Sequence, residues 1–159
     1  MPRKPSPLSA SPATLQLDNQ VCFALYSASL AMTKLYKPLL DAIGLTYPQY
    51  LVMLVLWEWH AAPPAQATVK ALGERLLLDS GTLTPLLKRL EQLALVQRRR
   101  SSSDERELCL ALTAAGEALR DRVLPLKQRL LCESGVDMDE LEGLRHSLGQ
   151  LLARVTAHS

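Results

Sequence analysis

The chain has 159 residues, enough for one domain with a substantial core, and 48% of them are hydrophobic. Its 18 basic residues nearly balance 16 acidic ones, so the net charge of +2 does not by itself indicate a nucleic-acid-binding protein. No apolar run reaches the ~18 residues of a membrane span, and residues 1–16 lack the apolar segment of a signal peptide. We therefore expect a globular cytoplasmic protein with a flexible tail over residues 1–16.

A long first helix is predicted between Asp18, which is expected to cap its N-terminus, and Gly44, which is expected to end it. The Lys37–Pro38 step is expected to bend it. Apolar residues recur along it about every 3.5 residues, the period of a seam between packed helices. This seam consists of Val21, Leu25, Ala28, Met32, Leu35 and Leu39.

A second helix is predicted from Thr46 to about His60. Thr46 and Gln49 have the spacing of a capping box, and Leu45 and Tyr50 have the spacing of a hydrophobic staple. Residues 61–67, which include a Pro-Pro pair, are predicted to form a loop. The inward face of the helix is expected to hold Leu51, Leu54 and Val55, with Trp57 and Trp59 filling the core near its end.

Residues 68–112 have the order helix, turn, helix and two-stranded ribbon. Thr68 is expected to cap the first of these helices, and a break is expected at Leu78–Asp79. The hairpin pairs residues 96–100 with residues 106–112 through a turn at residues 101–104. The second helix has an inward stripe of Leu83, Leu86, Leu87, Leu90 and Leu93. This order predicts a winged helix-turn-helix, a DNA-binding module.

The outward face of that second helix offers small hydroxyl groups and cations, which suit base edges and phosphates in a major groove. Its residues are Ser80, Thr82, Thr84, Pro85, Lys88 and Arg89, and the strand that follows adds Arg98, Arg99 and Arg100. Pro85 removes one backbone N–H and is expected to bend the helix slightly. A solvated basic surface without a ligand is the alternative, and the order of the elements favours DNA.

Two further helices are predicted after the hairpin. Thr113 caps the first, which has a Pro125 kink and ends at Gly135; the second opens at Asp137. Their apolar faces hold Leu119, Val123, Leu126 and Leu130 in the first, and Leu141, Leu144, Leu148, Leu151 and Val155 in the second. Because one small winged helix cannot cover these faces together with the first helix, a second copy of the chain is expected to do so.

These residues resemble a known family. LGERLLLDSGTLTPLLKRLE at residues 72–91 and DERELCLALT at residues 104–113 are similar to the multiple-antibiotic-resistance (MarR) group of bacterial repressors. LDNQVCFALYSAS at residues 17–29 and LYKPLLDAIGLTYPQYLVMLVLWE at residues 35–58 resemble its organic-hydroperoxide-sensing (OhrR) branch, two-cysteine type. The resemblance covers residues 17–159. It implies a mainly α (α+β) winged helix-turn-helix domain, with a DNA-binding lobe at about 46–112 and dimerisation helices at about 18–44 and 113–157.

From the residues alone, Cys22 is either a small packed hydrophobe, the simpler interpretation, or a reactive thiolate near a helix N-terminus. Tyr36 lies fourteen residues further along, about 21 Å on one helix at ~1.5 Å per residue, so the two meet only across an antiparallel dimer. The resemblance implies that Cys22 is the peroxide sensor and that Tyr36 and Tyr47 of the other subunit hydrogen-bond to it. It makes Cys132 the candidate resolving thiol, whereas Cys109 is expected to be inert.

The resemblance also implies that Arg106 enters a minor groove and that Asp104 holds its guanidinium. We expect a homodimeric repressor that binds an inverted repeat of double-stranded operator DNA and releases it when organic hydroperoxides oxidise Cys22. No metal, cofactor or membrane is expected to take part. The alternatives are a repressor released by a small phenolic ligand, with Cys22 passive, a thiol peroxidase, and a protein-interaction module without a DNA role.

Overall fold

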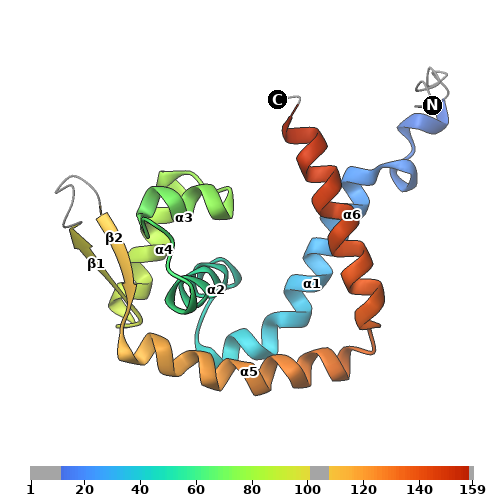
Figure 1. Cartoon of the computed structure of the whole chain (residues 1–159). Helices are drawn as coiled ribbons and strands as arrows, with labels where there is room; N and C mark the ends of the chain where they lie inside the picture. The colour runs from blue at the N-terminus through green and yellow to red at the C-terminus, as the bar shows by residue number, and fades with distance from the viewer. Residues whose placement is uncertain (1–11, 101–107, 158–159) are drawn as a thin grey trace. The chain divides into compact units, whose positions relative to one another are not determined.

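The computed structural model describes residues 12–100 and 108–157. The chain divides into two compact units, Met1–Lys37 and Pro38–Ser159. The described residues form two short 3-10 turns, six α-helices and two strands (Figure 1). Their bounds are η1 Pro12–Leu15, η2 Leu17–Asn19, α1 Val21–Ile43, α2 Tyr47–Ala61, α3 Val69–Leu76, α4 Ser80–Gln92, β1 Val96–Arg100, β2 Leu108–Leu112, α5 Ala114–Ser134 and α6 Met138–Thr156.

The first unit corrects the predicted start of the first helix. Asp18 lies in the 3-10 turn η2 and does not cap α1, which begins three residues later at Val21. The N–H of Gln20 donates to the carbonyl of Leu17 at 3.0 Å, and Gln20 is extended, at φ −90° and ψ 113°. This extended residue separates the turn from the helix, so Cys22 is the second residue of α1.

The helix α1 continues through Pro38 and ends at Ile43, and Gly44 has φ +69°, the left-handed conformation that favours glycine. Only Leu39 and Leu40 of α1 are buried. Val21 and Leu25, at the start of the predicted seam, are exposed in the single chain. The seam therefore has apolar surface that the single chain leaves in water.

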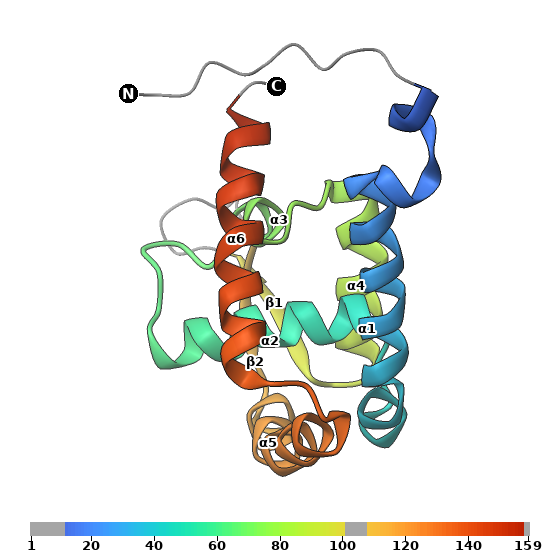
Figure 2. The same cartoon turned by 90° about the vertical axis from the view of Figure 1, so that its right-hand side faces the viewer.

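The helix α2 is the centre of the second unit and contacts α3, α4, α5 and β2 (Figures 1 and 2). The predicted capping box is confirmed: the backbone N–H of Thr46 donates to Gln49 Oε1 at 3.0 Å, and the Thr46 hydroxyl accepts from the Gln49 N–H. The predicted inward face was wrong in part, because Leu51 and Leu54 are only half-buried. Neighbours on several sides bury Tyr50, Val52, Met53, Val55, Leu56 and Trp57 instead.

The helices α3 and α4 form the predicted helix-turn-helix. Thr68 caps α3, and its hydroxyl accepts the N–H of Ala71 at 3.1 Å. Leu77 ends α3 in the left-handed conformation at φ 56°, and Asp79 then caps α4. The inward side of α4 buries Leu83, Leu87 and Leu90, three of the five leucines predicted for it.

The strands β1 and β2 pair antiparallel, as the hairpin pattern predicted. Their register places Val96 opposite Leu112 and Arg100 opposite Leu108. The N–H of Leu110 also donates to the carbonyl of Ala67 at 2.8 Å, which fastens β2 to the segment before α3. Leu110 is 5% exposed, whereas Cys109 on the other face of β2 is half-buried. The predicted turn at residues 101–104 lies outside the described residues.

The helix α5 begins at its predicted cap, since the Thr113 hydroxyl accepts the N–H of Gly116 at 3.0 Å. Its inward side buries Leu119, Val123 and Leu130, and Gly135 at φ 66° ends it. No residue of α6 is buried. Within the described residues, no single helix is long and apolar enough to cross a membrane, although the bent pair α1 and α2 together has the length and composition.

Candidate nucleic-acid interface and cysteine sites

The first turn of α4 is organised by the carboxylate of Asp79. Its Oδ1 accepts the backbone N–H of Thr82 at 2.8 Å, and its Oδ2 accepts the Thr82 hydroxyl at 3.1 Å. The hydrogen bonds from the Thr82 backbone and side chain lower the pKa of Asp79. The Thr84 hydroxyl donates to the carbonyl of Ser80 at 2.7 Å. Asp79 is therefore an ionised cap, and it fixes the side chain of Thr82.

The predicted outward face of α4 is exposed along its length. The six side chains named for it all lie in water: Ser80, Thr82, Thr84, Pro85, Lys88 and Arg89. Pro85 is the sixth residue of α4 and does not end it. An exposed helix with hydroxyl groups in its first turns and two cations after them has the composition of a helix that enters a major groove.

The arginines of β1 differ in their surroundings. Arg98 forms a bidentate pair with Glu91 of α4, with Nε to Oε1 at 2.9 Å and Nη2 to Oε2 at 2.6 Å. This hydrogen bonding raises the pKa of Arg98 and compensates its charge. Arg99 and Arg100 are exposed. Asp104 and Arg106, the predicted wing contacts, lie outside the described residues, so their roles stay predictions.

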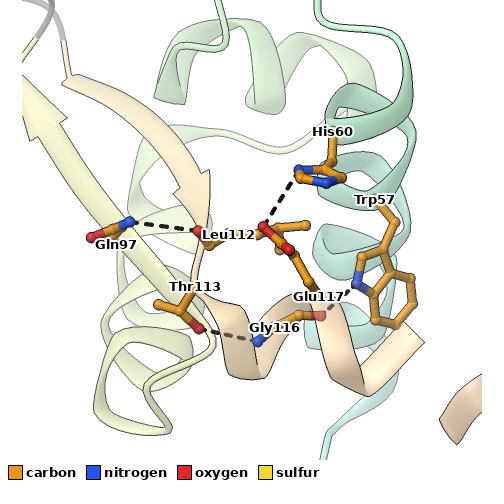
Figure 3. A network of polar contacts seen from close by, with 7 residues as sticks. All are labelled: Trp57, His60, Gln97, Leu112, Thr113, Gly116 and Glu117. Atoms are coloured by element: carbon orange, nitrogen blue, oxygen red, sulfur yellow. Dashed lines mark hydrogen bonds and ion pairs between the residues drawn. The ribbon is translucent and has the colours of Figure 1, made fainter. Parts of the chain in front are cut away.

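The base of the wing is fixed to α2 and α5 by a network of polar contacts (Figure 3). The indole N–H of Trp57 donates to the carbonyl of Gly116 at 2.8 Å, and the Thr113 hydroxyl donates to the carbonyl of Ala94 at 2.6 Å. His60 Nδ1 lies 3.7 Å from Glu117 Oε1. Two packed helices thus set where β1 and β2 emerge.

The three cysteines are free thiols in different settings. Cys22 is exposed at the start of α1, and Cys132 is exposed two residues before the end of α5. Cys109 is half-buried in β2, and its expected inertness stays a prediction. The unit Met1–Lys37 contains Cys22 and Tyr36, and the other unit contains Tyr47 and Cys132.

The predicted partners of the sensor thiol are both half-buried tyrosines on helices. Tyr36 lies in α1, fourteen residues after Cys22, and Tyr47 is the first residue of α2. The ring of Tyr47 lies 6.4 Å from that of Tyr50, between centroids. Packing against Tyr50 therefore restricts Tyr47, whereas the contact of either tyrosine with Cys22 stays a prediction.

Three residues that position this surface were not predicted from the sequence. Asp79 hydrogen-bonds Thr82, Glu91 pairs with Arg98, and Gly116 packs at the base of the wing. Asp79 carried a usable signal, since an Asp three residues before a Thr at a helix start is a common cap. Glu91 and Arg98 are separated by a turn whose course the sequence does not define. The need for glycine at residue 116 arises from a contact with Leu95, which only the fold reveals.

A helix-turn-helix followed by a two-stranded wing defines this chain as a winged-helix DNA-binding protein. Residues 34–123 match the family described as "Transcriptional regulator SarA/Rot". The chain belongs to the MarR family of transcriptional regulators and is not an enzyme.

Curated relatives support this assignment over most of the chain. The organic hydroperoxide resistance transcriptional regulator of Bacillus subtilis is 46% identical over 87% of this chain and 90% of its own. The HTH-type transcriptional regulator TtmR of Methylorubrum extorquens is 44% identical over 85% of this chain and 67% of its own. The HTH-type transcriptional regulator MgrA of Staphylococcus aureus is 35% identical over 86% of this chain and 90% of its own.

Solved structures match the fold. The crystal structure of AbfR of Staphylococcus epidermidis has a TM-score of 0.74 and 37% identity, covering 91% of this chain and 97% of that one. A structure of reduced AbfR bound to DNA has a TM-score of 0.70 at 37% identity, with the same coverage. This chain is accordingly a DNA-binding transcriptional regulator.

Proposed function

We propose that this chain is a homodimeric repressor that releases its operator when an organic hydroperoxide oxidises Cys22. The observation that carries the proposal is the free, exposed thiol of Cys22 at the start of α1 in a chain of this family. Two relatives support it: one is named for organic hydroperoxide resistance, and AbfR has been solved in reduced, overoxidized and disulfide forms.

The proposed DNA surface consists of the exposed face of α4 and the wing. Thr82, Thr84, Lys88 and Arg89 meet the major groove, with Ser80 and Pro85 beside them, and Arg100 lies toward phosphates. Arg98 is already engaged by Glu91, so we assign it the role of holding β1 against α4. Arg106, with Asp104 beside it, remains the proposed minor-groove contact.

The proposed dimer explains the apolar surface of α6. Leu144 is 52% exposed, Leu148 36% and Val155 57%, and they share one side of the helix with Leu141 and Leu151. Covering such a stripe contributes about 25 cal/mol of favourable free energy for each Å² of apolar area removed from water. A second copy covers it most simply, and a twofold dimer suits an inverted-repeat operator.

The proposed switch is chemical. A hydroperoxide transfers one oxygen to the Cys22 thiolate, which becomes a sulfenic acid while the hydroperoxide leaves as an alcohol. The sulfenic acid then condenses with the thiol of Cys132 from the other subunit, forming a disulfide and water. Tyr36 and Tyr47 of the other subunit are the proposed hydrogen-bond donors to the sensor sulfur. The new bond moves helices and thereby the recognition elements.

Operator binding before and after treatment with cumene hydroperoxide tests the proposal. Wild type should lose affinity after one equivalent, whereas Cys22→Ser should stay bound. Cys109→Ser is the matched control and should respond like wild type. Release of Cys22→Ser to the same extent as wild type would reject Cys22 as the sensor, and release by salicylate alone would favour a small phenolic ligand.

A non-reducing gel separates the second step from the first. Wild type and Cys109→Ser should run as covalent dimers after oxidation, and Cys22→Ser and Cys132→Ser as monomers. If Cys132→Ser still cross-links, another thiol resolves the sulfenic acid. If wild type leaves DNA without cross-linking, oxidation of Cys22 releases the operator without a disulfide between subunits, and Cys132 is not the resolving thiol.

A further inference from the structure

The hydroxyl hydrogens of Thr82 and Thr84 on α4 are both used inside the protein. A threonine hydroxyl has one hydrogen to donate and two lone pairs that accept. Thr82 donates its hydrogen to Asp79 Oδ2 at 3.1 Å, and Thr84 donates to the carbonyl of Ser80 at 2.7 Å. Both side chains are nevertheless exposed. What they offer to an approaching molecule is oxygen lone pairs.

These internal bonds favour one orientation of each hydroxyl. The acceptor for Thr82 is an ionised carboxylate, and hydrogen bonds to charged groups are about twice as strong as neutral ones. The same carboxylate accepts the Thr82 backbone N–H at 2.8 Å, so the two bonds hold one arrangement. The bond of Thr84 runs to the carbonyl four residues earlier, a geometry that the helix itself provides for threonine.

Space around Asp79 is also restricted. A Cβ added at Gly81 would lie 3.1 Å from Asp79 Oδ1, closer than ordinary van der Waals contact. Glycine at this position therefore lets the carboxylate remain over the first turn, where it accepts from Thr82. The Thr82 hydroxyl oxygen is therefore held in one orientation before DNA binds.

The major groove contains donors and acceptors in known places. Guanine N7 and O6, adenine N7 and thymine O4 accept, and the only donors are the exocyclic amino groups of adenine N6 and cytosine N4. A side chain whose own hydrogen is committed can bond only to those amino groups. Lys88 and Arg89 follow on the same helix as pure donors and suit phosphates or guanine.

We propose that Thr82 and Thr84 read the operator as hydrogen-bond acceptors, each taking a hydrogen from an exocyclic amino group of adenine or cytosine in the major groove. This inference rests on the proposed role of α4 as the DNA-reading helix and assigns the chemistry of its first turns. Asp79 is a positioning residue in it, because it acts on DNA through Thr82.

The test begins by selecting duplexes from a random DNA library with the reduced wild-type protein at one salt concentration. In the selected duplex, each adenine is replaced singly by 2-aminopurine, which still pairs with thymine but has no major-groove amino group. Each cytosine is replaced by N4-methylcytosine, and each guanine by 7-deazaguanine, which lacks the N7 acceptor. Affinities are measured for wild type, Thr82→Val and Thr84→Val, with Thr82→Ser and Thr84→Ser as controls that retain the hydroxyl.

Wild type should lose affinity about three- to tenfold at particular adenine or cytosine positions, the size of one hydrogen bond. Each valine variant should lose a similar factor on the unmodified duplex and show no further loss at its own position. The serine variants should respond like wild type. Coupling of a valine variant to 7-deazaguanine would show that the hydroxyl donates and would overturn the inference.

The outcomes also separate this inference from the proposed DNA surface. If the valine variants keep wild-type base preferences while Lys88→Gln weakens binding, α4 meets DNA and only the acceptor reading is overturned. If the valine variants and Lys88→Gln all bind like wild type, α4 is not the reading helix, and both proposals are overturned. Thermal melting of each variant confirms that it is folded.

Discussion

The DNA-binding elements and the C-terminal helix differ in how far one chain completes them. Around α2, α4 and the wing, leucines are buried and polar groups are joined by the contacts of Thr46, Asp79, Glu91 and Thr113. Along α6, no residue is buried, although its leucines have the spacing of a packed helix. The first region is packed within one chain, whereas the second exposes an apolar side to water.

This difference indicates which substitutions should change the stability of one chain and which should act through a partner. A change in the first region acts through contacts within one chain and should be visible in its free energy of unfolding. No residue of α6 is buried in the single chain, so a large effect of a change on its exposed side would indicate a partner. Matched substitutions in the two regions therefore test both the internal network and the proposed dimer.

The largest effect is expected from Leu148→Glu on the apolar side of α6. Leu148 is 36% exposed in the single chain, where a surface substitution normally changes stability by less than about 0.5 kcal/mol. If a second copy covers this side, the new carboxylate is buried without a partner, and we expect loss of the dimer with aggregation or unfolding. Sedimentation measures the outcome.

Gln150→Glu is the control for this change, because it adds the same charge at an exposed position on the same helix. It should assemble and melt like wild type. A well-folded soluble monomer from Leu148→Glu would contradict the obligate dimer, since the stripe would then tolerate water.

A smaller but still large effect is expected from Gly116→Ala at the base of the wing. A Cβ at this position would lie 2.1 Å from the carbonyl oxygen of Leu95 and 3.2 Å from Leu112 Cδ2. Because the first contact is with backbone, relief requires α5 to move from the wing, and we expect a loss of roughly 3 kcal/mol. Chemical denaturation measures the free energy of unfolding.

Gly149→Ala is the matched substitution on α6, where no heavy atom of the described residues beyond the helix's own neighbouring backbone lies within 4 Å of the added Cβ. Alanine is favoured over glycine in a helix by about 1 kcal/mol, so this variant should be slightly more stable than wild type. Equal effects of the two substitutions would contradict the close packing of Gly116.

Local features of the fold could be predicted from the sequence because they depend on neighbouring residues. Thr46, Thr68 and Thr113 cap helices as expected, since a cap needs only the next three residues. Asp18 shows the limit of the same rule. It has the residue type of a cap, but Gln20 adopts an extended conformation and delays the helix to Val21.

Features that depend on distant neighbours could not be predicted. Periodicity marks one inward face of a helix, but α2 is surrounded by four elements and buries residues on several sides. Likewise, the exposed face of α4 followed from its pattern, whereas the pairing of Glu91 with Arg98 depends on how β1 leaves the turn. The residues expected to contact DNA could thus be predicted from the sequence, whereas the residues that position them could not.

A moderate effect is expected from Glu91→Gln, which removes the charge that engages Arg98. The two side chains are 27% and 30% exposed, so the pair is partly screened, and we expect a loss of about 1 kcal/mol in stability. The freed guanidinium gains access to phosphate. The slope of log affinity against log salt should therefore steepen by up to about one unit.

Operator titrations at several salt concentrations measure this slope. Glu74→Gln is the control, because Glu74 is an exposed acid on α3. An unchanged slope with reduced affinity would mean that Arg98 only positions β1. A shallower slope than wild type would contradict the proposed role of the pair.

The smallest effect is expected from the pH dependence of the Asp79 cap. Hydrogen bonds from Thr82 lower the pKa of Asp79 in the folded chain below its value in the unfolded chain. Such a group contributes stability in full above its unfolded pKa and loses it as the pH falls through the lower folded pKa.

Asp79→Ala should therefore lower the Tm slightly at neutral pH, and the difference from wild type should shrink as the solution becomes acidic. Asp79→Asn keeps a cap oxygen without the charge, so it should differ less from wild type at neutral pH, and this difference should also shrink as the pH falls. Melting curves of the three proteins at matched ionic strength, from neutral pH to below the ordinary carboxyl range, provide the comparison. A difference between Asp79→Ala and wild type that stays constant across this range would show that ionisation of Asp79 does not stabilise the first turn of α4.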